Sequence, residues 1–128
     1  LDNQPICKMS RLSERMMKSI DYTVVKERRR ENFKILHEAL ESSNQIEVKL
    51  DEEAVPMVYP YMMDKAGLRE HLIKNRVFVA KYWPNVLEWT EGKSTEYHLV
   101  QNLLPLPIDH RYERPAMNKI IEIISRYG

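Results

Sequence analysis

The sequence predicts an α+β fold in which a small, mainly antiparallel sheet is covered by helices, with two of the helices at the N-terminus. Apolar residues recur at helical spacing near both ends of the chain, and short runs rich in Val, Tyr and Leu lie between them. The expected order is helix, helix, strand, helix, strand, helix, strand, helix, which offers too few strands for a doubly wound sheet. We expect 1–128 to be a single domain, with N-terminal helices over about 8–43 and an α/β sandwich over about 46–127.

Two helices are predicted in the first third of the chain. Ser10 or Ser13 is a candidate N-cap for the first, and Asp21 is the expected N-cap of a second helix that runs to about Ser43. The apolar stripe of the first helix is Met9, Leu12, Met16 and Ile20. The stripe of the second is Tyr22, Val25, Phe33, Leu36 and Leu40.

Arg29 and Asn32 fall on or beside the stripe of the second helix. The preferred interpretation places both at its margin, where the arginine stem packs and the charged head reaches water. The alternative is a buried polar pair, which needs hydrogen-bond partners from another segment. The basic run 26–30 is interrupted by Glu27 and is interpreted as a solvated helix face.

The middle of the chain predicts short strands alternating with helices. Residues 46–50 alternate like an edge strand, and 55–63 form a strand-like run that its prolines confine to a sheet edge. The remaining expected elements are a helix from its cap Asp64 to about Asn75, a buried strand 77–80, a loop 89–94, a helix 95–101 and an extended run 103–108. The last helix begins near Pro115 and has the stripe Met117, Ile120, Ile121 and Ile124.

The composition excludes several classes of protein. Hydrophobic residues make up 43% and charged residues 30%, a balance typical of soluble globular domains. No run approaches the roughly 18 apolar residues of a membrane span, and a net charge of +1 favours neither nucleic acid nor a membrane as partner.

Gly67, Gly92 and Gly128 are too scattered for a phosphate-binding loop. The single cysteine, Cys7, excludes a disulfide framework within one chain. The four histidines lack the spacing of metal ligands, so no metal site is expected.

The densest group of polar and aromatic residues is 81–85, directly after the predicted strand 77–80. Such a group at a strand end, in a turn stiffened by proline, suits a ligand or partner surface. Trp83 suits closure of the core equally well, whereas the hydroxyl of Tyr82 favours function. A second polar group, 109–112, also follows an extended run; by itself it is more simply a loop leading into the last helix.

Four segments carry a resemblance when they are taken in order: 29–32 (RREN), 55–60 (VPMVYP), 78–84 (FVAKYWP) and 102–112 (NLLPLPIDHRY). Together they resemble the C-terminal small domain of the DegT-type aminotransferases. These are pyridoxal-phosphate enzymes of fold type I, many of which aminate keto sugars attached to nucleotides. The resemblance spans about 6–127. Family members often have histidine where Tyr82 stands, so the substrate contact here is expected to differ.

The resemblance implies a role for this chain within a larger enzyme. The substrate-binding residues it suggests are Lys81, Tyr82 and Trp83, with Arg111 as a weaker candidate for an anionic group. In the family, the Schiff-base lysine and the phosphate site belong to the preceding large domain. The resemblance therefore implies no catalytic, cofactor-binding or metal-binding residue here, and no pyridoxal phosphate bound by this chain alone. Its implied partners are the upstream catalytic domain of the same polypeptide and, in the intact enzyme, a second copy.

Two expectations remain beside this one. The chain opens with Leu1 rather than Met and carries no evident signal, so we expect a cytoplasmic protein whose start is processed or lies upstream. The alternative function is a free-standing α/β module that binds a ligand or regulates a partner without catalysis.

Overall fold

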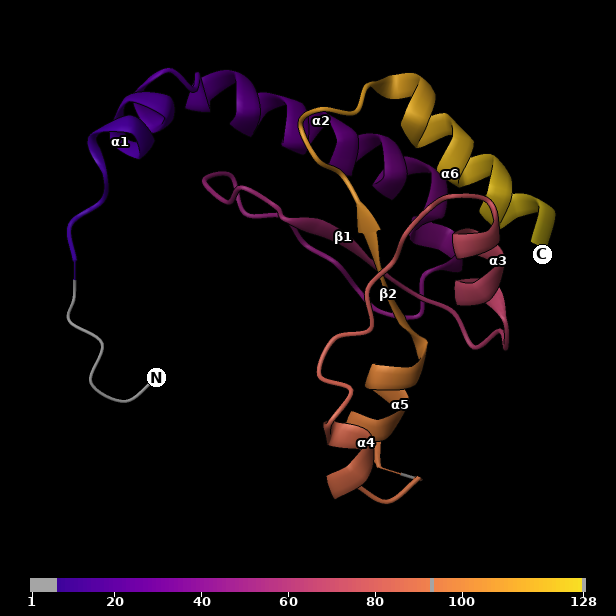
Figure 1. Cartoon of the computed structure of the whole chain (residues 1–128). Helices are drawn as coiled ribbons and strands as arrows, with labels where there is room; N and C mark the ends of the chain where they lie inside the picture. Colours follow the sequence, from indigo (N-terminus) through magenta and orange to yellow (C-terminus); the bar gives the residue numbers. More distant parts are fainter. Residues whose placement is uncertain (1–6, 93, 128) are drawn as a thin grey trace.

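The computed structural model describes residues 7–92 and 94–127, and it has the expected α+β architecture. A two-stranded antiparallel sheet lies in the middle, and helices surround it (Figure 1). The elements of the described residues are α1 (Arg11–Lys18), α2 (Tyr22–Leu40), the 3₁₀ turn η1 (Glu41–Ser43), β1 (Val58–Met62), α3 (Leu68–Lys74), α4 (Val86–Trp89), α5 (Thr95–Asn102), β2 (Leu103–Pro107) and α6 (Arg114–Tyr127).

The register of the sheet explains how it tolerates its prolines. Pro60 on β1 lies opposite Pro105 on β2, and Tyr59 lies opposite Leu106. Two prolines cannot exchange amide hydrogen bonds, so Pro60 and Pro105 form a non-hydrogen-bonded pair whose nitrogens face the outer edges. The hydrogen-bonded positions therefore fall on the alternate residues, and the prolines remove no donor from the ladder.

The core lies between the sheet and α2, α3 and α6. In Figure 1, α2 and α6 run side by side across one end of the sheet, while α3 lies beside α6. Each of these elements contributes at least one side chain that solvent does not reach: Leu36, Tyr59, Leu72, Leu106 and Met117. Burying one such large side chain stabilises the fold by roughly 1.5–3 kcal/mol.

Two predicted strands are absent from the described sheet. Residues 46–50 and 77–80 are extended but have no ladder partner. In both segments alternate side chains pack against the core, as Val48, Val77 and Val79 do. That packing accounts for the alternation in the sequence, because periodicity reports burial and cannot reveal whether a backbone partner exists.

Side-chain caps define three of the helix starts among the described residues. The carboxylate of Asp21 accepts from the amides of Thr23 and Val24, which confirms the predicted N-cap of α2. Ser10 caps α1 and Ser94 caps α5 in the same way.

The predicted start of α3 is wrong: the helix begins at Leu68, not after Asp64. Gly67 precedes it with φ 84°, a conformation that glycine adopts without strain. A Cβ at Gly67 would also lie 2.7 Å from the Tyr127 hydroxyl, which donates to the Ala66 carbonyl. The start of α3 is therefore set both by the glycine turn before it and by the contact with Tyr127 at the end of α6.

Arg29 and Asn32 do not lie at the margin of the α2 stripe. Asn32 is 0% exposed, and its Nδ2 donates to the carbonyls of Asp109 (3.1 Å) and Tyr112 (3.0 Å). The Arg29 guanidinium pairs with Asp109 and reaches the carbonyls of Pro56 and Met57. The alternative interpretation, a buried polar pair with partners from another segment, is the one that the structure supports.

The basic run 26–30 is likewise not a purely solvated face. Arg30 donates to the carbonyls of Asp51 and Ala54, which ties α2 to the loop before β1. Tyr22, expected on the stripe of α2, is exposed instead. It stands at the start of α2, where Figure 1 shows the helix extending beyond the sheet.

α1 projects from the rest of the chain in Figure 1, and none of its residues is buried. Its apolar residues share one side of the helix and are exposed: Leu12, Met16 and Met17 within α1, with Met9 and Ile20 just beyond its ends. No helix among the described residues has the length and apolar character needed to span a membrane.

Candidate functional site

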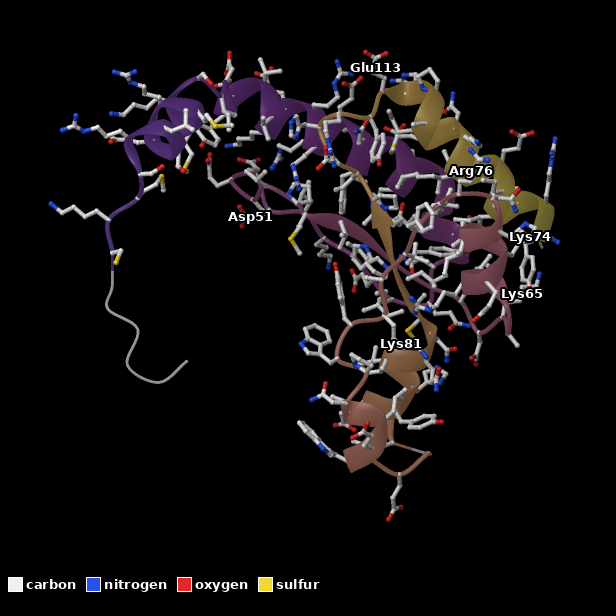
Figure 2. All side chains as sticks on the ribbon, viewed as in Figure 1. Asp51, Lys65, Lys74, Arg76, Lys81 and Glu113 are labelled. Atoms are coloured by element: carbon white, nitrogen blue, oxygen red, sulfur yellow. The ribbon has the colours of Figure 1, made fainter. Side chains whose placement is uncertain are left out.

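The turn 81–83 lies at the base of a projection formed by α4 and α5. Figure 1 shows this helix pair extending away from α2 and α6, on the opposite side of the sheet. Figure 2 places Lys81 beside the junction of α5 with β2. Its Nζ donates to the Gln101 side chain at 3.0 Å, so one end of the turn is held against the last turn of α5.

Trp83 does not close the core, which decides between the two interpretations of this residue. Its side chain is 65% exposed, and its φ of 49° lies in the left-handed region, an outlier for so bulky a residue. The neighbouring ring of Tyr82 is half-buried, with its centroid 5.5 Å from that of Trp83 and the planes 59° apart. Strained residues of this kind persist where the surrounding structure holds them, often at ligand sites.

A cavity of about 230 Å³ opens beneath these two rings. Its walls combine the aromatic pair with aliphatic side chains and one carboxylate: Tyr82, Trp83, Val86, Glu96, Leu99, Val100 and Leu103. Such a cavity can hold a small apolar or planar group, because apolar walls with few polar atoms are typical of ligand pockets.

Arg111 lies at the other end of β2. Lys81 contacts Gln101, just before the strand, whereas Arg111 follows Pro107, after it. Five residues of strand span roughly 16 Å, so Arg111 and the turn 81–83 do not form one compact site in this chain. The structure thus brings Lys81, Tyr82 and Trp83 together and leaves Arg111 apart.

Arg111 belongs to a second polar group centred on Asp109. Its Nε donates to Asp109 Oδ1 at 2.7 Å, and its backbone amide donates to the same oxygen at 3.0 Å. Burial raises the pKa of the Asp109 carboxyl, but the hydrogen bonds and charge of Arg111 and the charge of His110 outweigh it, so this pKa lies below its ordinary 3.8. The hydrogen bond to Asp109 in turn raises the pKa of the Arg111 guanidinium. The Arg111 guanidinium is therefore already paired with Asp109, although its side chain is exposed.

The described residues do not fit pyridoxal phosphate. A Schiff-base lysine must be desolvated and held against the cofactor, yet every described lysine side chain is exposed or only partly buried. Lys81 faces Gln101 rather than an enclosed cavity. Among the described residues, no three His, Cys, Asp or Glu side chains are grouped so that they could hold a metal ion.

One residue close to the site could not be singled out from the sequence. Arg69, on α3, donates to the carbonyls of Val79 and Ala80, directly before the turn, and to that of Leu103. In the sequence it falls within the helix predicted from Asp64 to about Asn75, with no feature that distinguishes it. Only the fold shows that it reaches the extended segment and β2.

Comparison with known proteins gives no match to a family model, a curated protein or a solved structure. Any assignment of function to this chain therefore depends on its own residues and their arrangement.

Proposed function

We propose that this chain is the small domain of a pyridoxal-phosphate-dependent aminotransferase of the DegT type. In the intact enzyme it would cover the active-site cleft of an upstream large domain of the same polypeptide. The substrate would be a keto sugar nucleotide or a similar small molecule, and the enzyme a cytoplasmic homodimer. The large domain would hold the cofactor, and this chain alone would be inactive.

The observation that carries the proposal is the amount of apolar surface that the chain leaves uncovered. Leu12 and Met16 on α1 and the side chains of Phe78, Trp83 and Trp89 are all more than half exposed. These side chains lie in two separate parts of the chain, on α1 and within 78–89. Exposed apolar side chains that gather in a large patch mark a surface that another body covers. A covering domain supplied by the same polypeptide would account for their exposure, and the resemblance of the four segments, taken in order, indicates which domain that is.

The turn 81–83 supplies what a small domain would add to the active site. The exposed indole of Trp83 and the ring of Tyr82 would shield the cleft from water, which strengthens the electrostatic interactions within it. The Lys81 ammonium, next to these rings, would attract an anionic group of the substrate. Arg111 would have this role only where the substrate or a second copy reaches the other end of β2.

The first test is to sequence the coding DNA upstream of Leu1. An open frame that encodes a large α/β domain with a glycine-rich phosphate turn and a Schiff-base lysine supports the proposal. A start codon adjacent to Leu1 rejects it. The alternative function, a free-standing module, would then apply, and the 230 Å³ cavity beneath Tyr82 and Trp83 is the observation that favours it.

A second test uses the chain itself. A severed small domain is expected to bind a hydrophobic dye or to self-associate, whereas a free-standing module does neither. Incubation with pyridoxal phosphate followed by borohydride is expected to leave no stoichiometric adduct on one specific lysine. Such an adduct, together with turnover of an amine donor, would place the cofactor site in this chain and contradict the proposal.

A further inference from the structure

Arg69 connects three carbonyl groups that come from two separate segments. Its Nη1 donates to Val79 (3.4 Å) and to Ala80, and its Nη2 donates to Leu103 at 2.7 Å. Val79 and Ala80 end the extended segment 77–80, and Leu103 begins β2. A guanidinium suits this task, because its planar fork presents several donors in a fixed geometry.

The carbonyls that Arg69 binds lack the partners that a sheet would give them. Leu103 lies in the non-hydrogen-bonded register with Met62, so its carbonyl faces the outer edge of β2. No described backbone amide donates to the carbonyl of Val79 or of Ala80. Arg69 thus takes the place of a strand ladder between 77–80 and β2, and it holds the residues directly before Lys81.

Burying part of a charged guanidinium costs free energy, which argues that the contacts of Arg69 are not incidental. Burial lowers the pKa of the Arg69 guanidinium, and the charge of Glu70 opposes that shift only in part; no carboxylate among the described residues forms an ion pair with Arg69. Its helix is fixed to the core by Leu68 and Leu72, which are buried. The guanidinium is partly desolvated, its helix is fixed to the core, and its three acceptors are carbonyls of neighbouring segments. Such contacts fix the position of the segment 77–80 more than they raise the overall stability of the fold.

We propose that Arg69 is a positioning residue that fixes the turn 81–83, and with it the rings of Tyr82 and Trp83, against β2 and α5. The role in substrate binding rests on the proposed function, whereas the effect on the turn does not. Lys81 donates to Gln101 directly after Ala80, and the Trp83 carbonyl accepts from the Val86 amide at 2.9 Å. Removing Arg69 therefore releases the carbonyls of 79–80, while these two contacts and the buried Val79 side chain remain.

The first experiment follows the two tryptophans by NMR in the isolated chain. The two indole N–H signals are assigned with Trp89→Phe, so that Trp83 reports on the turn and Trp89 on α4. The variants are Arg69→Met, which keeps the stem and loses every donor, and Arg69→Lys, which keeps the charge and loses the fork. Arg126→Met, which breaks an exposed ion pair with Glu122 on α6, is the matched control.

The expected result in Arg69→Met is a shift of the Trp83 signal toward its unfolded position, with the Trp89 signal unchanged. Backbone order parameters at 80–83 are expected to fall from about 0.85 to below about 0.6, with a partial return in Arg69→Lys. The control should leave both signals in place. Unchanged order at 80–83 in a folded Arg69 variant overturns the proposal, and so does global unfolding of both Arg69 variants.

The second experiment uses the full-length enzyme. In Arg69→Lys the KM for the amino acceptor is expected to rise about tenfold, as loss of one or two hydrogen bonds implies. The half-reaction with the amino donor should keep its rate. A fall in kcat for both half-reactions with KM unchanged would contradict a positioning role. If no aminotransferase activity exists, the proposed function fails, and the NMR result still decides whether Arg69 fixes the turn.

Discussion

Arg29 on α2 and Asp109 after β2 form an ion pair between positions 80 residues apart, with Nη2 3.3 Å from Oδ2. The two side chains are 20% and 24% exposed, so the pair is largely shielded from solvent. Beside it, Asn32 holds the carbonyls of Asp109 and Tyr112. The loop between β2 and α6 is therefore attached to the middle of α2 by charge and by hydrogen bonds.

Asn32→Ala is expected to lower the free energy of unfolding by about 2–3 kcal/mol, because two carbonyls lose their donor in a buried place. Urea unfolding followed by circular dichroism measures the change. Asn118→Ala, at an exposed position on α6, is the control and should change stability by less than about 0.5 kcal/mol. Equal effects of the two substitutions would show that the Asn32 amide contributes nothing specific.

Asp109→Asn is expected to reduce stability at neutral pH and to matter less as the solution becomes acidic. The pKa of the Asp109 carboxyl is lowered in the folded chain, so its stabilising contribution is complete above the ordinary value of 3.8. That contribution is lost as the pH falls through the lowered pKa. Urea unfolding of both proteins from about pH 7 to about pH 2 measures the gap between them. A gap that stays constant over this range would refute the assignment.

Trp83→Gly is expected to preserve or raise stability, by up to about 1 kcal/mol, although it removes a large side chain. The left-handed backbone at Trp83 costs an L-residue about 1–2 kcal/mol, which outweighs the entropy cost of glycine. Trp89→Gly is the control, because Trp89 is similarly exposed but ends α4 with an ordinary backbone; we expect it to destabilise by up to about 1 kcal/mol. Thermal unfolding of the two variants compares them directly, and equal destabilisation would argue against strain at Trp83.

Replacing Leu12 and Met16 together by Asp is expected to reduce dye binding or self-association at least severalfold. The free energy of unfolding should change by less than about 0.5 kcal/mol, because α1 contributes no buried residue. Dye fluorescence and analytical ultracentrifugation measure the first effect, and urea unfolding measures the second. A large loss of stability would mean that α1 packs on the body of the chain in solution.

Sequence reasoning succeeded where local chemistry decides the structure. The N-cap at Asp21, the last helix with Pro115 in its first turn, and the extended run that became β2 all follow from neighbouring residues. The α+β class followed from them. Of the strand-like runs, 55–63 and 103–108 contain β1 and β2, whereas 46–50 and 77–80 form no strand although their side chains alternate in burial.

The predictions that failed depend on contacts between distant parts of the chain. The segment 77–80 forms no ladder, and its last two carbonyls accept from Arg69 instead; Asn32 is buried where it donates to the carbonyls of Asp109 and Tyr112. These partners come from other parts of the chain, and helical periodicity does not reveal them. The turn 81–83 could be singled out from composition, whereas its separation from Arg111 along β2 required the fold.

The proline pairs of the sheet also bear on aggregation. A two-stranded sheet consists of nothing but edges, and exposed edges act as templates on which other chains add strands. Here Pro60, Pro105 and Pro107 lie on those edges and offer no amide to an incoming strand. On the β1 side, the Asn44 amide also occupies the Pro60 carbonyl. Replacing Pro60 or Pro105 by valine would add no hydrogen bond between β1 and β2, but it would place a free amide on an outer edge and would therefore make the protein more prone to form fibrils.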